Sequence, residues 1–211
     1  MITSKLTKGY SQSNQDLFVL ELLDYKKNGT YLEIGGSEPI KINNTYLMET
    51  DYEWTGVSVE IDSGLCEKYN KTRKNKCINE DATTLDYKKL LDDNFSTKRI
   101  DYLSLDIDPA INTYTALCNL PLDDYRFTVV TFEHELYAEP TGDYYKEKAK
   151  EIFLSNGYKL VAENVRNNNK PYEDWYVDTT VLEQDCYEKF ISKDLEYSEI
   201  ISLSGPHSGG C

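Results

Sequence analysis

The sequence has little of what metal-binding modules, disulfide-rich proteins and membrane proteins need. It contains two histidines, six prolines and five widely spaced cysteines with no C-x-x-C pair in 211 residues. This pattern indicates neither a zinc knuckle nor a disulfide framework. No apolar run approaches the roughly 20 residues that span a bilayer, so no membrane insertion is expected. Residues 1–5 lack the apolar core of a signal peptide, which favours a cytoplasmic location.

Positive charge is also scarce. The chain has 23 lysines and arginines against 37 acidic residues, a formal net charge of −14. A surface this acidic repels phosphates, so we expect no nucleic-acid partner. One basic cluster is present, and we interpret it as the solvated end of a helix: Lys68, Lys71, Arg73, Lys74 and Lys76.

The remaining composition is that of a globular domain, with 39% hydrophobic residues. Short apolar runs alternate with amphipathic stretches, which predicts βαβ units and a mostly parallel sheet. We therefore expect one doubly wound α/β domain over residues 1–203 and a flexible tail over 204–211. The expected strands are 30–34, 56–61, 76–80, 100–107, 127–132, 159–162 and 174–178. The expected helices are 11–25, 43–50, 63–73, 84–92, 110–119, 143–155 and 181–190.

Ligands of such folds bind beyond the carboxyl ends of the strands, so the strand-end residues matter most. Gly35 and Gly36 follow the first expected strand and either admit a ligand close to the backbone or form a plain tight turn. The dinucleotide fingerprint G-x-G-x-x-G is absent. Glu60 closes the second strand 24 residues after Gly36. A carboxylate about 20 residues past such a glycine turn typically accepts hydrogen bonds from a ribose diol. Asp81 follows the third strand and either contacts an adenine amino group or caps a helix.

Acidic residues also close the next two strands. Asp106 and Asp108 end the fourth, and Glu133 with His134 ends the fifth. Carboxylates that converge repel one another unless a proton, a metal or a cationic ligand compensates. Helix caps and solvated charges would explain any one of these residues alone, but they explain the group less well.

Several segments together resemble the FkbM-type family of S-adenosylmethionine (SAM) dependent methyltransferases. The matching stretches are 11–12, 15–16, 31–38, 43–49, 54–60, 100–106 and 173–177. The resemblance implies a Rossmann-like class I methyltransferase fold, with a seven-stranded sheet whose last strand is antiparallel. It also implies SAM as methyl donor and a sugar or glycan hydroxyl as acceptor. The chain departs from the family pattern at Pro39 and at residues 107–109.

The resemblance further implies roles for individual residues. It places Glu33, Gly35 and Gly36 beside the methionine part of SAM, Glu60 at the ribose and Asp81 near the adenine. Gln12 and Asp106 are expected to contact the same cofactor.

The strand-end acids are also similar to those of metal-dependent O-methyltransferases. This similarity suggests Asp106, Glu133 and His134 as ligands of Mg²⁺ or Mn²⁺, and Asp108 or His134 as the catalytic base. Adjacent residues of a strand face opposite ways. Glu133 and His134 can therefore share one ion only if the strand has already ended at Phe132.

The chain contains 18 tyrosines and two tryptophans. The sequence does not decide whether these aromatic residues pack in the core or contact a ligand. Trp54 and Trp175 are expected in the core, unless Trp175, Tyr137 or Tyr172 stacks on a sugar ring. The same sequence features are compatible with two functions other than methyl transfer. One is a nicotinamide-dependent oxidoreductase, and the other is a non-catalytic module that binds a nucleoside or a protein partner. No sequence feature indicates an oligomeric state.

Overall fold

The computed structural model describes residues 8–138 and 141–203, and its centre is one eight-stranded sheet. The strand order is β3-β2-β1-β4-β5-β7-β6-β8. The first five strands are mutually parallel, and β7 runs antiparallel to both β5 and β6. The strands are β1 Thr30–Ile34, β2 Thr55–Glu60, β3 Lys76–Asn79, β4 Arg99–Leu105, β5 Arg126–Glu133, β6 Tyr158–Asn167, β7 Lys170–Asp178 and β8 Ser192–Lys193.

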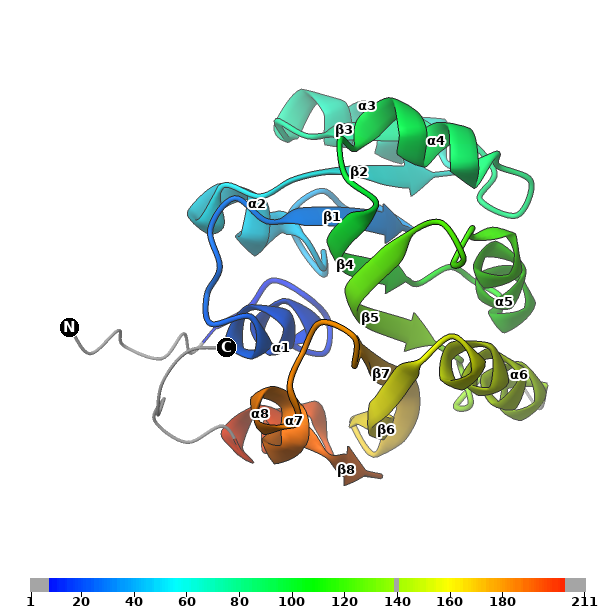
Figure 1. The fold of residues 1–211 in the computed structure, drawn as a ribbon. Helices are drawn as coiled ribbons and strands as arrows, with labels where there is room; N and C mark the ends of the chain where they lie inside the picture. Colours follow the sequence, from blue (N-terminus) through cyan, green and yellow to red (C-terminus); the bar gives the residue numbers. More distant parts are fainter. Residues whose placement is uncertain (1–7, 139–140, 204–211) are drawn as a thin grey trace.

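Helices cover both faces of this sheet (Figure 1). The helices α1, α2, α7 and α8 contribute to one apolar core, and α4, α5 and α6 contribute to the other. The helices are α1 Gln15–Leu22, α2 Tyr46–Tyr52, α3 Ser63–Thr72, α4 Tyr87–Asn94, α5 Ala110–Asn119, α6 Gly142–Ser155, α7 Gln184–Tyr187 and α8 Tyr197–Leu203, with a 3₁₀ turn at Glu188–Phe190.

Alternation along the strands divides the side chains between these two cores. Tyr31 packs toward α1 and α2, whereas its neighbour Leu32 packs toward α4 and α5. The central strands are buried on both faces, which is why they read as continuous apolar runs in the sequence.

The expected fold class is confirmed. Strand order, parallel strands β1 to β5 and an antiparallel β7 are those of the class I methyltransferase fold. The antiparallel step arises at a two-residue turn between β6 and β7. Both turn residues have positive φ, 54° at Asn168 and 62° at Asn169, as a tight hairpin turn requires. The eighth strand, β8, was not expected.

Element boundaries differ from the expectation where the backbone leaves regular geometry. Helix α1 is shorter than 11–25 because Asn14, Asp24 and Tyr25 take positive φ at its two ends. Strand β6 is longer than 159–162, and its pairing with β7 contains three register shifts. These irregularities interrupt the two-residue alternation that would reveal a strand in the sequence.

The expected tail, 204–211, lies outside the described residues, and the domain boundaries stay a prediction. Among the helices that the structure describes, none is long and apolar enough to cross a membrane. Cys66, Cys77 and Cys118 are free thiols, but Cys186 is disulfide-bonded. Cysteine spacing does not indicate this bond, because the fold decides which thiols meet. The cytoplasmic location also stays a prediction.

Candidate functional site

A large cavity opens where the chain reverses its direction across the sheet, between β1 and β4. It has a volume of about 400 Å³ and is lined by residues that follow β1, β2, β4 and β5. A smaller cavity of about 100 Å³ adjoins it toward β3. The two cavities share Gly35, Glu60, Ile61, Ile107 and Asp108. The predicted strand-end position of the site therefore agrees with the geometry.

The glycine turn brings two strand ends into close contact. Gly35 has φ of +95°, and a Cβ atom there would lie 1.9 Å from the backbone oxygen of Asp106. The backbone N–H groups of Gly35 and Gly36 both donate to the carbonyl of Val59, at 3.0 Å each. Only glycine combines this φ with this approach, so the turn fixes the position of Asp106 beside the cavity.

Glu60 connects the two loops that border both cavities. Its Oε2 accepts a hydrogen bond from the Ser37 backbone N–H, and its Oε1 accepts one from Asp62, each at 2.8 Å. A carboxylate offers about four acceptor positions. Two positions therefore stay available, on a side chain that lines both cavities.

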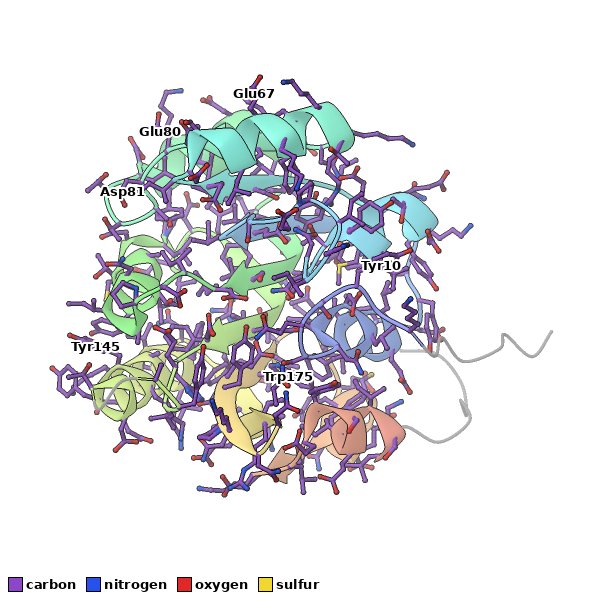
Figure 2. The ribbon with its side chains drawn as sticks, turned by 180° about the vertical axis from the view of Figure 1, so that it is seen from behind. Tyr10, Glu67, Glu80, Asp81, Tyr145 and Trp175 are labelled. Atoms are coloured by element: carbon purple, nitrogen blue, oxygen red, sulfur yellow. The ribbon has the colours of Figure 1, made fainter. Side chains whose placement is uncertain are left out.

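Asp81 lies at the rim of the smaller cavity, at the outer edge of the molecule (Figure 2). Its Oδ1 accepts hydrogen bonds from the Thr83 backbone N–H and from the Thr83 hydroxyl, and these bonds lower the pKa of Asp81. The residue that caps α4 is Asp86. Asp81 therefore stabilises a turn, and its other oxygen accepts no hydrogen bond from the described residues.

Three further carboxyl groups line the larger cavity: Asp106, Asp108 and Glu133. Burial, together with the neighbouring charge of Asp106, raises the pKa of Glu133 well above its usual range. Two carboxyl groups this close are less readily ionised together, so Asp106 favours the protonated form of Glu133. Two tyrosines donate to this pair, Tyr172 to Asp106 Oδ2 at 3.4 Å and Tyr137 to Glu133 Oε1 at 3.5 Å.

The predicted metal site is not formed. His134 is fully buried and does not line the cavity, and its Nε2 lies 3.6 Å from Asp174 Oδ1. Strand β5 continues through Glu133, so Glu133 and His134 face opposite sides of the sheet. Within residues 8–138 and 141–203, no three His, Cys, Asp or Glu side chains are arranged to hold a metal ion. Because His134 does not line the cavity, its position gives no support to the predicted role as a catalytic base.

Glu33 is buried and is not among the described residues that line the larger cavity. The Ser58 hydroxyl donates to its Oε2 at 2.6 Å and the Tyr69 hydroxyl at 3.3 Å. Burial raises the pKa of Glu33, although the nearby Arg73 opposes this shift. Its observed contacts are structural, whereas Gln12, Gly35, Glu60 and Asp106 do line the larger cavity.

The interpretation of the basic cluster as a solvated helix end is wrong at Arg73. The Arg73 side chain is fully buried, and its Nε donates to Glu49 Oε2 at 2.9 Å. Its guanidinium also donates to the carbonyl of Pro39 and to Asn43 Oδ1. It thereby holds the loop that brings Asn44 to the cavity.

Several residues that line the cavity were not predicted as cofactor contacts, and Asn44 and Ile61 are two of them. Asn44 donates to the Ser104 hydroxyl at 2.9 Å and lines the larger cavity. Ile61 is 69% exposed although it is a large apolar residue. Ile61 could have been found from the sequence, because it is an apolar residue directly after Glu60, the acid that ends a strand.

Trp175 is a core residue, as expected, and it lines neither the larger nor the smaller cavity. Its side chain is fully buried and lies against Phe18, with ring centroids 4.2 Å apart. Trp54 is also buried. Tyr137 and Tyr172, in contrast, line the larger cavity.

The buried carboxyl group of Glu173 predicts how the stability of the protein depends on pH. Burial and the charge of Asp106 raise the pKa of Glu173 well above its usual range. The folded state therefore keeps a proton that the unfolded chain loses above about pH 4.3, so stability falls as pH rises from there toward the folded pKa. We expect Glu173→Gln to remove this loss and to raise Tm at pH 8 by about 2–4 °C, or about 1 kcal/mol.

Thermal unfolding at pH 5 and pH 8 measures this effect. Glu183→Gln, at an exposed position, is the matched control and is expected to follow the wild type. Equal pH dependence in wild type and Glu173→Gln would show that Glu173 is ionised in the folded protein.

No family model and no curated protein matches this chain. Solved structures do match it in fold. A putative rRNA-methylase from Clostridium thermocellum has a TM-score of 0.54 at 13% identity, over 82% of this chain and 99% of that one. The human methyltransferase 10 domain containing protein has a TM-score of 0.50 at 10% identity, over 82% and 83% of the two chains. At these identities the likeness establishes the fold alone.

Proposed function

We propose that this protein is a SAM-dependent methyltransferase that methylates a hydroxyl group of a sugar or glycan. The observation that carries the proposal is the charge of the larger cavity. Four carboxyl groups line it, from Glu60, Asp106, Asp108 and Glu133, and no cationic side chain is among its described lining residues. SAM carries a sulfonium and an ammonium group, which such a cavity attracts, whereas a dinucleotide pyrophosphate is repelled. The same charge disfavours the nicotinamide-dependent alternative.

The residues present fit the parts of SAM. The free acceptor positions of Glu60 suit a ribose diol, as in other doubly wound folds. Ile61 and Ile107 give the smaller cavity apolar surface for an adenine ring, with Asp81 at its rim. Asp106 and Gln12 line the larger cavity, where the methionine ammonium would be held.

When bound, SAM supplies a methyl group whose carbon–sulfur bond breaks as the acceptor oxygen attacks, leaving a neutral thioether. The protein must then remove the hydroxyl proton. Asp108 is the best placed base. Its carboxylate lines both cavities and accepts no hydrogen bond from the described residues. Asp106, by contrast, already accepts hydrogen bonds from Asn44 and Tyr172.

Charge and the resemblance to FkbM-type enzymes support the proposed acceptor. A phosphate-rich acceptor would meet both the net charge of −14 and the cavity carboxylates. A neutral, hydroxyl-rich acceptor avoids this repulsion, which supports a sugar and disfavours a nucleic acid.

Cofactor binding tests the proposal directly. Isothermal titration of the full chain is expected to show binding of S-adenosylhomocysteine and none of NADH. Binding of NADH alone would establish the oxidoreductase alternative, and binding of neither would refute the enzyme proposal.

Glu60→Ala is expected to raise the Kd of S-adenosylhomocysteine by about 10- to 100-fold, because a charge-assisted hydrogen bond is lost. Titration calorimetry of the variant measures this change. Glu67→Ala, on the outer surface of α3, is the control and is expected to keep wild-type affinity (Figure 2). Unchanged affinity in Glu60→Ala would exclude Glu60 from the cofactor site.

A further inference from the structure

A third cavity lies beside the larger one and is not explained by cofactor binding. It has a volume of about 210 Å³ and is lined by Gln12, Tyr137, Asn167, Asn168, Lys170 and Tyr172. Gln12 and the two tyrosines line the larger cavity as well, so the two spaces meet at these residues. The larger cavity is lined by four carboxyl groups. The described lining of the third cavity instead consists of side-chain amides, two tyrosines and the ammonium group of Lys170.

Two tyrosine rings form the boundary between the cavities. The ring centroids of Tyr137 and Tyr172 are 6.0 Å apart, and their planes differ by 31°. Their hydroxyls are directed to the acids, since Tyr137 donates to Glu133 and Tyr172 to Asp106. The two rings contribute apolar surface to this otherwise polar cavity, next to the carboxyl groups of the proposed reaction.

The hairpin turn between β6 and β7 supplies the polar wall. Asn168 donates to Asn167 Oδ1 at 2.8 Å, and Asn167 donates to the Ser13 hydroxyl at 3.1 Å. These bonds fix both amides at a turn that positive φ values already define. Lys170 lies with its Nζ 5.7 Å from the centre of the Tyr137 ring and forms no ion pair with a described residue.

We infer that this third cavity is the acceptor subsite and holds one neutral pyranose ring. The C–H face of the ring packs on Tyr137 and Tyr172, and its hydroxyls bond to the amides and to Lys170. One hydroxyl then points toward Asp108 in the larger cavity. This inference rests on the proposed function and adds the residues that select the acceptor.

Size and charge favour a sugar ring over a nucleotide. Pockets that enclose drug-sized ligands measure roughly 300–1,000 Å³. The third cavity, at about 210 Å³, suits a single ring. Base recognition on aromatic residues is usually combined with several cations along the nucleic-acid backbone. Among the described residues that line this cavity, Lys170 is the one with a cationic side chain.

Saturation-transfer NMR on the full chain with S-adenosylhomocysteine tests the inference. The probes are the methyl pyranosides of glucose, galactose, mannose and rhamnose, with uridine as the nucleoside comparison. We expect at least one pyranoside to bind, with the strongest transfer to hydrogens of one ring face, and we expect no transfer to uridine.

Matched variants locate the binding. Tyr137→Leu is expected to weaken pyranoside binding about 10-fold by removing the ring. Tyr144→Leu, an exposed tyrosine on α6 outside the cavity, is its control. Asn168→Gly keeps the positive-φ turn and removes one amide, for a loss of about 3- to 10-fold. Asn169→Gly alters the same turn at a residue that does not line the cavity, and is expected to bind as the wild type does.

The outcomes separate this inference from the proposed function. Binding of S-adenosylhomocysteine without any pyranoside, or pyranoside binding that Tyr137→Leu and Asn168→Gly leave unchanged, overturns the subsite and leaves the cofactor proposal intact. Transfer to uridine alone would assign the cavity to a nucleic-acid acceptor. Failure to bind S-adenosylhomocysteine overturns the proposed function itself.

Discussion

Asp108→Asn is expected to lower kcat by about 10²- to 10⁴-fold, the usual contribution of a general base. The amide keeps the shape of the side chain but cannot accept the hydroxyl proton. Asp108 is exposed and accepts no hydrogen bond from the described residues, so the substitution disturbs no internal contact. Transfer of labelled methyl from SAM to a pyranoside that binds the wild type measures the rate.

Two controls make this result specific. The Kd of S-adenosylhomocysteine is expected to stay within about twofold in Asp108→Asn, because the proposed cofactor contacts Glu60 and Asp106 are unchanged. Asp123→Asn, at an exposed position before β5, is expected to keep the wild-type rate. A normal kcat in Asp108→Asn, combined with a large loss in Asp106→Asn, would assign the base to the Asp106–Glu133 pair.

Arg73→Met is expected to lower the free energy of unfolding by about 3–5 kcal/mol, because it leaves Glu49 as an unpaired buried charge. The two side chains are 0% and 4% exposed. Arg73 also lies over the ring of Tyr69, 4.6 Å from its centroid. Small domains are stable by only about 5–15 kcal/mol, so this loss is a large fraction of the total. Urea unfolding measures it.

Further variants distinguish the buried pair from surface charge. Lys71→Met breaks the exposed pair with Glu67 and is expected to cost less than about 1 kcal/mol. Arg73→Met with Glu49→Gln removes both charges and is expected to recover part of the loss. This double variant also keeps the test valid if Arg73→Met alone does not fold. A loss below about 1 kcal/mol in Arg73→Met would contradict the structural role of the pair.

The strand-end positions of the site follow from the sequence alone. Buried strands of a parallel sheet read as apolar runs, and their carboxyl ends meet at one edge, which points to Gly35, Glu60, Asp106 and Asp108. Predicting these residues requires only local information: where a strand ends, and which residue stands at or after that end. The alternation of helices and strands predicted the doubly wound α/β domain, and the resemblance to FkbM-type methyltransferases implied the class I fold.

The tertiary structure decided what depends on the direction of side chains and on distant contacts. Continuation of β5 by one residue turned His134 away from the cavity and removed the expected metal site, because alternate strand residues face opposite sides. Burial of Arg73 depended on Glu49, 24 positions earlier in the chain. The third cavity joins Gln12, Tyr137 and the β6–β7 turn, three segments far apart in the sequence. Local patterns record the period of a strand and its end, but only the packed chain determines which side chains from distant segments share a space.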